Sequence, residues 1–410
     1  MGKRLIYINL DGFGKYYYDE MPDCGTELEG IAELRRMGCF FKEAYTGIPS
    51  ITFPMQSAIV SGCYSSRTGN CDKVWDRERN EVIPLKRLNR AETIGEVLEK
   101  ENIKTVSIQQ FTLENRGCRR DDPDHLYVQP GGDYRRRFDM LERLIQKKEI
   151  EAEGRVIRYE ELPEAIFVYI DDLDTIGHNP DFCRQEKESG RAAKGQERLR
   201  EIDKRICVLL EILKGQGLLE NTYVLLTTDH GMISYKEDKT KALKSALEEW
   251  GFSKVSCCWE GSVPEETQVL LTGHGIQCQI YLPQGTQEAD RQRLKHYLET
   301  MDFTDQVLTA EELAERGVCR EYADLVVSPK EGMGFSFGGM EEGRLYASHD
   351  SLHEKCQHIF AVLTGPDIKK GYVEERTVKN IDFIPSLAEH MGWRKPKNAA
   401  GSLPGSVFTS

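Results

Sequence analysis

The chain is organised around one short stretch, residues 47–62, which reads Gly47-Ile48-Pro49-Ser50-Ile51-Thr52-Phe53-Pro54-Met55-Gln56-Ser57-Ala58-Ile59-Val60-Ser61-Gly62. Gly, Pro and Ser before Thr52 predict a turn, and the small and apolar residues after Pro54 predict a buried helix. A hydroxyl residue at this place is typical of a helix cap. The same place also offers free backbone N–H groups and the positive end of the helix dipole, which favour an anion such as phosphate. Thr52 is therefore either an ordinary cap or a residue that meets an anionic ligand.

Composition excludes several classes of protein. The 410 residues carry a net charge of −13 and are 39% hydrophobic, which indicates a globular protein with a real core, as one large domain with insertions or as two domains. The acidic balance argues against a nucleic-acid polymer or an anionic membrane as partner, because such binding needs clustered Lys and Arg. A phosphorylated small molecule stays compatible, since bound cations can reverse the local field.

Cysteine use and the start of the chain predict a cytoplasmic protein. The 12 cysteines are scattered and form no Cys-x-x-Cys pair, so neither a zinc ribbon nor a disulfide framework is indicated. Residues 1–10 show no signal-peptide pattern, and no apolar run approaches membrane-spanning length. We therefore expect no membrane association, and the sequence leaves the oligomeric state open.

Acidic and histidine side chains follow three predicted buried strands, residues 5–10, 165–170 and 222–228. The residues that follow the strands are Asp11, Asp174, His178, Asp229 and His230. Taken alone, Asp11 would be a turn or cap residue, but such groups are costly to bury unless they are paired or bind a metal. Because the carboxyl ends of parallel strands meet at one edge of a sheet, the pattern predicts an oxygen- and nitrogen-rich metal site that suits Zn²⁺ or Mn²⁺.

A further histidine ligand is expected near the C-terminal part of the chain. His349 and His353 directly precede a predicted core strand over residues 357–363, and the sequence leaves open which of the two completes the site. Lone histidines are more often structural than ligands, and we assign that role to His125, His274, His296 and His390.

The alternation of strands and helices predicts an α/β fold with a mostly parallel central sheet flanked by helices. Helices are expected over residues 31–37, 93–100 and 199–213, and a strand over residues 104–108. The pattern changes between residues 233 and 345, where helices at 241–250 and 289–301 flank a strand at 277–282 and a Gly-rich segment closes the region. We predict an inserted α+β cap subdomain over residues 233–345 and a core made of residues 1–232 and 346–410.

In combination and in order, these motifs resemble the alkaline phosphatase superfamily, nearest its type I phosphodiesterase/nucleotide pyrophosphatase branch. The resemblance rests on Ser-Ile-Thr-Phe-Pro around Thr52, on Asp-Thr-Ile-Gly-His, on Asp-His-Gly-Met and on Ser-His-Asp-Ser-Leu around His349, where the family more often has Gly at Asp350. It implies an alkaline phosphatase-like core and two divalent ions, most often zinc, with Mn²⁺ as an alternative. One ion takes Asp11, Asp229, His230 and Thr52, and the other takes Asp174, His178 and His349.

The resemblance also implies the chemistry. Thr52 is similar to the branch's threonine nucleophile, so the expected activity is two-metal hydrolysis of phosphodiester or pyrophosphate-type bonds through a phospho-threonine intermediate. The alternatives are a phosphomonoesterase or a phosphonoacetate-type phosphonate hydrolase with the same metal site. A catalytically silent binding protein is a remote alternative, because no expected ligand or nucleophile is lost.

Substrate contacts are the least determined part of the prediction. Family members commonly have Asn two residues after the nucleophile's Phe, where it helps hold a phosphoryl oxygen; Met55 stands there in this chain. Gln56 or the backbone N–H of Phe53 is expected to take its place. The expected partner is a phosphorylated small molecule such as a nucleotide, and candidates for an aromatic clamp on its base are Phe53, Tyr16, Tyr17, Tyr18, Trp75 and Tyr127.

Overall fold

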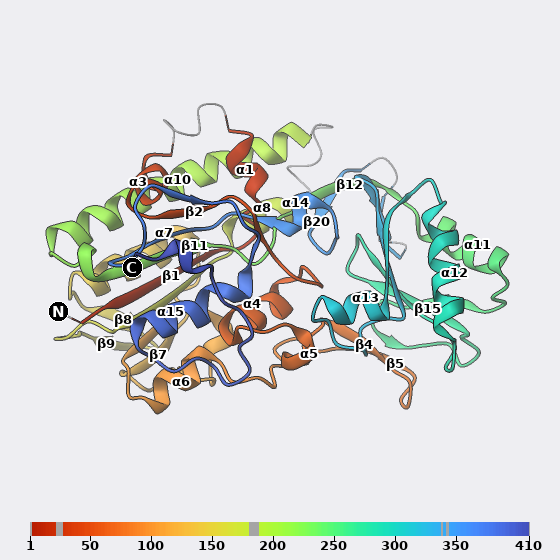
Figure 1. Cartoon of the computed structure of the whole chain (residues 1–410), viewed down its shortest axis with the longest axis horizontal. Coiled ribbons are helices and arrows are strands. Elements are labelled where there is room, and N and C mark those ends of the chain that lie inside the picture. The colour runs from red at the N-terminus through yellow and green to blue at the C-terminus, as the bar shows by residue number, and fades with distance from the viewer. Residues whose placement is uncertain (1, 22–27, 180–187, 338, 342–343, 410) are drawn as a thin grey trace.

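A computed structural model describes residues 2–21, 28–179, 188–337, 339–341 and 344–409. Its largest element is an eight-stranded sheet (Figure 1). In spatial order the strands are β23 (Tyr372–Glu374), β2 (Cys39–Phe41), β22 (Val362–Thr364), β11 (Thr222–Thr227), β1 (Arg4–Leu10), β10 (Ala165–Ile170), β6 (Thr105–Ile108) and β7 (His125–Val128). Of these eight, β22 alone runs antiparallel to its neighbours. The predicted α/β class with a mostly parallel sheet is confirmed.

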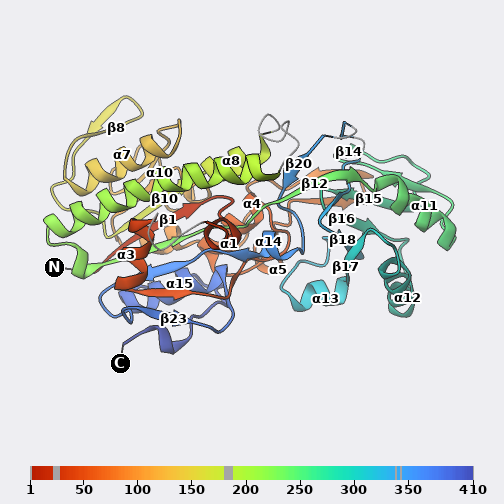
Figure 2. The same cartoon turned by 90° about the horizontal axis from the view of Figure 1, so that it is seen from above.

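Helices cover both faces of this sheet, which is why its central strands are apolar throughout (Figure 2). On one face Ile6 and Ile8 of β1 pack in a core with α3 (Glu29–Met37), α7 (Tyr134–Ile145) and α10 (Glu188–Gly215). On the other face Leu5 and Tyr7 pack with α4 (Thr52–Ser61), α6 (Ile94–Lys100) and α15 (Phe383–Met391). Full burial of such a side chain stabilises the fold by about 1.5–3 kcal/mol, so both layers hold the sheet in place.

The register of the three central strands brings their carboxyl ends to one level. Leu10 of β1 lies opposite Ile170 of β10, and Asn9 lies opposite Thr227 of β11. The residues that directly follow these strands therefore emerge side by side at one edge of the sheet, where α8 (Asp172–His178) also begins.

A second, smaller body lies beyond this edge, at the right of Figure 1. Its five-stranded sheet runs in the order β13 (Val255–Cys257), β15 (Val269–Gly273), β16 (Cys278–Tyr281), β18 (Leu325–Pro329) and β17 (Thr304–Thr309). Its helices are α11 (Thr240–Trp250), α12 (Glu288–Glu299) and α13 (Ala310–Glu315). The first two contribute to the hydrophobic core on this sheet.

Short strands join the two bodies. The hairpin of β4 (Lys73–Asp76) and β5 (Glu81–Pro84) pairs with β14 (Gly261–Ser262), so a segment from the first hundred residues packs against the second body. Between the bodies, β12 (Ile233–Asp238) pairs with β19 (Gly332–Gly334) and β20 (Tyr346–Ser348). The division of the chain at residues 233 and 345 stays a prediction.

The remaining α-helices and strands are short. They are α1 (Lys15–Asp19), α5 (Ser65–Thr68), α14 (Glu354–Gln357), the pair β8 (Ile150–Ala152) and β9 (Arg155–Ile157), and the three strands β21 (His358–Ile359), β3 (Ala44–Tyr45) and β24 (Val378–Lys379). The prediction of one strand over residues 357–363 was wrong, because the chain leaves α14, pairs first with β3 through β21 and only then enters the main sheet as β22. Within the described ranges, no helix combines the length and the apolar character needed to cross a membrane.

Candidate active site

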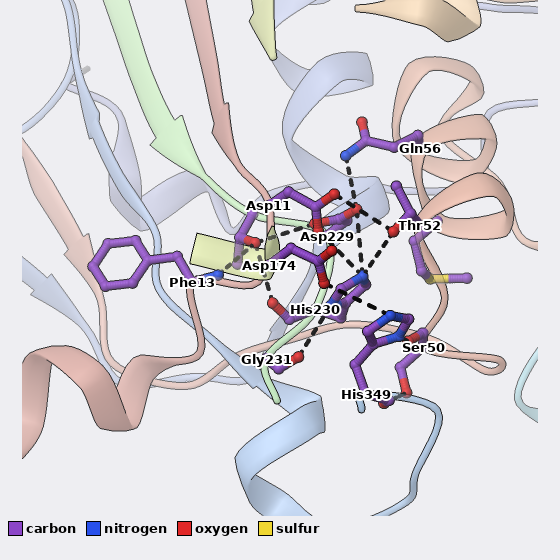
Figure 3. A network of polar contacts seen from close by, with 12 residues as sticks. Asp11, Phe13, Ser50, Thr52, Gln56, Asp174, Asp229, His230, Gly231 and His349 are labelled. Atoms are coloured by element: carbon purple, nitrogen blue, oxygen red, sulfur yellow. Dashed lines mark hydrogen bonds and ion pairs between the residues drawn. The ribbon is translucent and has the colours of Figure 1, made fainter. Parts of the chain in front are cut away.

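Thr52 is the first residue of α4, and its side chain does not cap the helix. The cap position belongs to Ile51, which makes no side-chain bond to the helix end. The Thr52 hydroxyl instead lies 3.1 Å from Nε2 of His230 and 3.5 Å from Oδ2 of Asp11 (Figure 3). The interpretation of Thr52 as an ordinary cap is therefore wrong. Because residues 54–61 of α4 are buried, the helix holds this hydroxyl firmly beside the carboxylates.

The residues predicted from the strand ends lie together at the edge of the sheet. Two groups each place three possible ligand atoms within 4.8 Å of one another: Asp11, Asp229 and His230 form the first, and Asp174, His230 and His349 form the second. His178 joins the second group, since its Nε2 lies 3.3 Å from Oδ1 of Asp174. Nε2 of His349 lies 3.7 Å from the same oxygen.

The structure also decides which of His349 and His353 lies at the site. His349 follows β20 and its ring stacks on that of His230, with 3.8 Å between ring centroids. His353 stands at the start of α14, where its ring accepts the backbone N–H of Lys355. Its Nε2 faces Glu331 at 3.9 Å. The turn after β20 thus brings His349, and not His353, to the acidic cluster.

All three clustered histidines are oriented by main-chain carbonyls. Nδ1 of His178 bonds to the Ala347 carbonyl at 3.1 Å, Nδ1 of His230 to that of Gly231 at 3.0 Å, and Nδ1 of His349 to that of Ser50 at 2.8 Å. A carbonyl only accepts, so each Nδ1 carries the hydrogen and each Nε2 presents its lone pair toward the carboxylates. Such bonds fix the tautomer that a metal-binding histidine needs.

The carboxylates are only partly satisfied by the protein. The Tyr169 hydroxyl donates to Oδ2 of Asp11, and Gln56 and Thr228 donate to Asp229 at 2.9 and 3.2 Å. The Oδ1 atoms of Asp11 and Asp174 are buried and accept no hydrogen bond from the part of the chain that the structure describes. Buried carboxylate oxygens with free lone pairs, facing imidazole nitrogens, fit divalent cations of the Zn²⁺ or Mn²⁺ type.

The protonation behaviour of the site agrees with this fit. Burial, reinforced by the charges of Asp229 and Asp174, raises the pKa of Asp11 well above its usual range. Burial and the neighbouring His230 lower the pKa of His349 well below its usual range, so this imidazole is neutral. Burial opposes ionisation of Asp174, but the adjacent His178 and other histidines outweigh it and hold the pKa of Asp174 below its usual range. The protein thus brings together carboxylates that cannot all ionise unless positive charge is added.

Gln56 belongs to a buried amide network behind the site. Its Nε2 donates to Oδ1 of Asn9 and to Oδ2 of Asp229, each at 2.9 Å, and its Oε1 accepts from Gln110 at 2.8 Å. The side chain is fully buried. Contact of Gln56 with substrate stays a prediction, whereas the structure gives this side chain a role in orienting Asp229. Met55 is buried in a cluster with Tyr64 and Ile381.

Of the predicted aromatic clamp, Phe53 stands directly beside Thr52. It meets Phe111 edge to face at 5.2 Å between centroids, and Phe111 meets Tyr169 in the same way at 5.2 Å. Tyr17 and Tyr127 are fully buried, and Trp75 packs on Tyr281 in the second body.

Several supporting residues were not anticipated from the sequence. They are Asn9, Ser50, Gln110, Phe111 and Tyr169. Asn9 carried a usable signal, because it is a polar residue inside the apolar run of the first strand. Ser50 and Tyr169 lie within or beside the quoted motifs, but only the folded chain shows that they contact His349 and Asp11, and Gln110 and Phe111 belong to no motif.

The fold is of the alkaline phosphatase-like type, and comparison with known proteins shows the family. The family model described as type I phosphodiesterase/nucleotide pyrophosphatase matches residues 5–352. The chain belongs to this family, whose members are metal-dependent hydrolases of phosphoric esters.

Individual relatives are distant. An ectonucleotide pyrophosphatase/phosphodiesterase of Caenorhabditis elegans is 25% identical over 237 residues, which are 56% of this chain but only 28% of that protein. Murine ectonucleotide pyrophosphatase/phosphodiesterase 5, in an inactive threonine-to-alanine variant in complex with AMP, superposes with a TM-score of 0.67 at 14% identity, covering 96% of both chains. The human protein of the same name superposes with a TM-score of 0.65 at 14% identity, covering 98% of this chain and 96% of that one. At these identities the two structures show the shared fold.

Proposed function

We propose that this protein hydrolyses phosphodiester or pyrophosphate-type bonds of nucleotide-like small molecules, with Thr52 as the nucleophile. The observation that carries the proposal is the position of the Thr52 hydroxyl, 3.1 Å from His230 and 3.5 Å from Asp11 at the start of a buried helix. Asp11, Asp229 and His230 would hold one divalent cation near this hydroxyl, and Asp174, His178 and His349 would hold the other. When bound, such cations favour the alkoxide form of a hydroxyl and neutralise charge on phosphoryl oxygens.

The reaction uses two displacements at phosphorus. The Thr52 oxygen loses its proton and forms a bond to phosphorus, while the bond to the leaving oxygen breaks and that oxygen leaves with a proton. Water then attacks the same phosphorus, releases the phosphorylated product and restores the hydroxyl. In the first turn of α4, Thr52 and Phe53 carry N–H groups that have no partners within the helix, and these groups would stabilise charge that develops on the phosphoryl oxygens.

A diester is the preferred substrate in this proposal. Among the described residues, the ion pairs of Asp11, Asp174 and Asp229 are all with histidines, so no Arg or Lys pairs with these carboxylates. A monoester carries a second negative charge, which a cationic side chain would match, and the assay below decides between the two. The murine protein of the same fold holds AMP, which is consistent with a nucleotide as the half of the substrate that becomes bonded to Thr52. Phe53 with Phe111 offers aromatic surface for the base of this nucleotide.

The compartment predicted from the sequence is also kept as a proposal. The ten described cysteines are all free, which is the pattern expected in a reducing cytoplasm.

The test compares bis-p-nitrophenyl phosphate with p-nitrophenyl phosphate on protein loaded with Zn²⁺ or Mn²⁺. We expect a clear diester preference in the wild-type protein, loss of turnover in Thr52→Ala and partial activity in the control Thr52→Ser, which keeps a hydroxyl. Wild-type-like turnover in Thr52→Ala would overturn the nucleophile assignment. A monoester preference would assign the protein to the phosphomonoesterases. No turnover of either compound by metal-loaded protein would favour a phosphonate as the substrate.

A further inference from the structure

A large cavity opens beside the candidate active site. It has a volume of about 600 Å³ and begins at His178. Its walls are mainly aromatic: Trp259, His274, Phe337, Tyr235 and Tyr346 line it together with Met340. This volume is in the range of sites that hold a small organic ligand, and Thr52 is not among the residues that line it.

The cavity borders the second group of ligands, whereas the nucleophile lies at the first. The Thr52 hydroxyl contacts His230 and Asp11, whereas the cavity meets His178, which pairs with Asp174. The ring of His274, which lines the cavity, lies nearly parallel to the ring of His349, with 6.4 Å between centroids. In displacement at phosphorus the attacking and leaving oxygens stand roughly in line. The cavity is therefore placed to receive the leaving group.

The walls are held by specific contacts. Nδ1 of His274 lies 3.3 Å from Oδ2 of Asp72, and the Trp259 ring lies 5.2 Å from that of His274 and 6.3 Å from that of Phe337. The glycines on either side of His274 allow close approach. A Cβ at Gly273 would come within 2.4 Å of the Gln277 carbonyl oxygen and 3.2 Å of the Phe337 ring, and Gly275 has a φ of +103° with the Tyr235 hydroxyl close by.

The two faces of Trp259 differ, and this difference indicates the ligand. Nζ of Lys73 lies 3.9 Å from the centre of the Trp259 ring and donates to the Gly273 and Trp259 carbonyls. The Lys73 side chain is only 4% exposed, so it covers the buried face. Trp259 itself is 42% exposed and lines the cavity, so a ligand bound there would stack on the face that Lys73 leaves free. A cation stacked there would be repelled by Lys73 through the ring, whereas an uncharged planar ring would stack without this penalty.

We propose that this cavity is a leaving-group subsite that stacks a planar heterocycle, such as a nucleobase, against Trp259. The inference rests on the proposed function and deepens it. The preferred substrate then carries an aromatic base on each side of the scissile bond, as in a dinucleoside pyrophosphate. The retained base lies toward Phe53, and the departing base lies in the cavity.

The experiment uses two pyrophosphates that share the retained half. Diadenosine pyrophosphate has a second adenine, whereas adenosine diphosphate ribose has the same linkage without one. Removing a stacking partner of a base costs about 1–3 kcal/mol, so Trp259→Ala should lower kcat/KM for diadenosine pyrophosphate about 5- to 150-fold. The same substitution should change kcat/KM for adenosine diphosphate ribose by no more than about twofold. Trp259→Phe, which keeps a stacking ring, should recover most of the loss.

Trp250 offers a matched control, since it is 38% exposed on α11 and packs on Tyr297 away from the cavity. Trp250→Ala should leave both substrates unchanged. Equal losses on the two substrates in Trp259→Ala, or none on either, would overturn the leaving-group subsite while leaving the proposed function intact. If the wild-type protein, with metal bound, cleaved neither pyrophosphate nor bis-p-nitrophenyl phosphate, the proposed function would fail and this inference with it.

Discussion

The contact between Gly177 and Met232 joins two motifs and can be tested by one methyl group. Gly177 precedes His178 in α8, and Met232 follows His230 and Gly231 after β11. A Cβ at position 177 would lie 1.9 Å from Sδ and 2.5 Å from Cε of Met232, a fully buried side chain. Ordinary contacts between such atoms are about 3.5–4 Å. In Gly177→Ala, Met232 or α8 must therefore move until the new Cβ and the Met232 sulfur are separated by an ordinary contact distance.

The expected magnitudes follow from this overlap. Overpacking a core costs about 1–3 kcal/mol, and Ala gains about 1 kcal/mol over Gly within a helix. The net loss of unfolding free energy in Gly177→Ala should therefore be at most about 2 kcal/mol. The larger effect falls on the ligands that α8 carries, Asp174 and His178. Displacing the support of metal ligands typically weakens metal binding about 10- to 100-fold. In Gly177→Ala, the affinity for the ion held by Asp174 and His178 should therefore fall by that factor.

A double-mutant cycle separates the contact from other effects. Met232→Ala alone should cost about 2–5 kcal/mol because it leaves a cavity. In Gly177→Ala/Met232→Ala the new methyl group occupies space that the sulfur vacates, so the double variant should be at least about 1 kcal/mol more stable than the sum of the single effects predicts. Urea unfolding in chelator gives the stabilities, and calorimetric Zn²⁺ titration gives the affinities. Additive stabilities together with wild-type metal affinity in Gly177→Ala would refute the reasoning.

Three further predictions concern the supports of the site and of the fold. Gln56→Leu removes the donor to Asp229 and leaves buried amides unpaired, so it should weaken metal binding about 10- to 100-fold and lower the unfolding free energy by about 2–5 kcal/mol; unchanged Zn²⁺ titration would contradict this. His349→Ala should reduce the bound metal, measured by elemental analysis after desalting, far more than His353→Ala, and the reverse order would make His353 the ligand. Hydrogen bonds from Arg394 lower the pKa of Glu92 to about 2 in the folded protein. As pH falls, Glu92 is therefore protonated first in the unfolded chain, and the stability that its charged form gives the fold is lost between about pH 4.5 and pH 2. Glu92→Gln should therefore lose less stability than wild type between pH 5 and pH 3, and parallel thermal unfolding curves would contradict this.

The metal-ligand cluster was the part most accessible from the sequence. Asp11, Asp174 and Asp229 each follow a strand, and parallel neighbours in register must deliver them to one edge. The choice between His349 and His353 was not accessible, because it depends on the turn after β20 and on the Ser50 carbonyl that orients the ring.

Contacts between distant segments escaped prediction for a similar physical reason. Gln56 points into the core because all of α4 beyond its first turn is buried, and only the folded chain shows that Asn9 and Gln110 meet it there. The β4–β5 hairpin pairs with a two-residue strand nearly two hundred residues later, which no local periodicity signals. The cavity around Trp259 is likewise assembled from segments that are separate in the sequence.

The central claim is that Thr52 forms a covalent bond to phosphorus during turnover. The most direct measurement is the stereochemical course of hydrolysis of a nucleotide phosphorothioate diester that is chiral at phosphorus, run in ¹⁸O-labelled water. Two successive in-line displacements, first by Thr52 and then by water, predict retention of configuration. Inversion would show that water attacks phosphorus directly and would contradict the role assigned to Thr52.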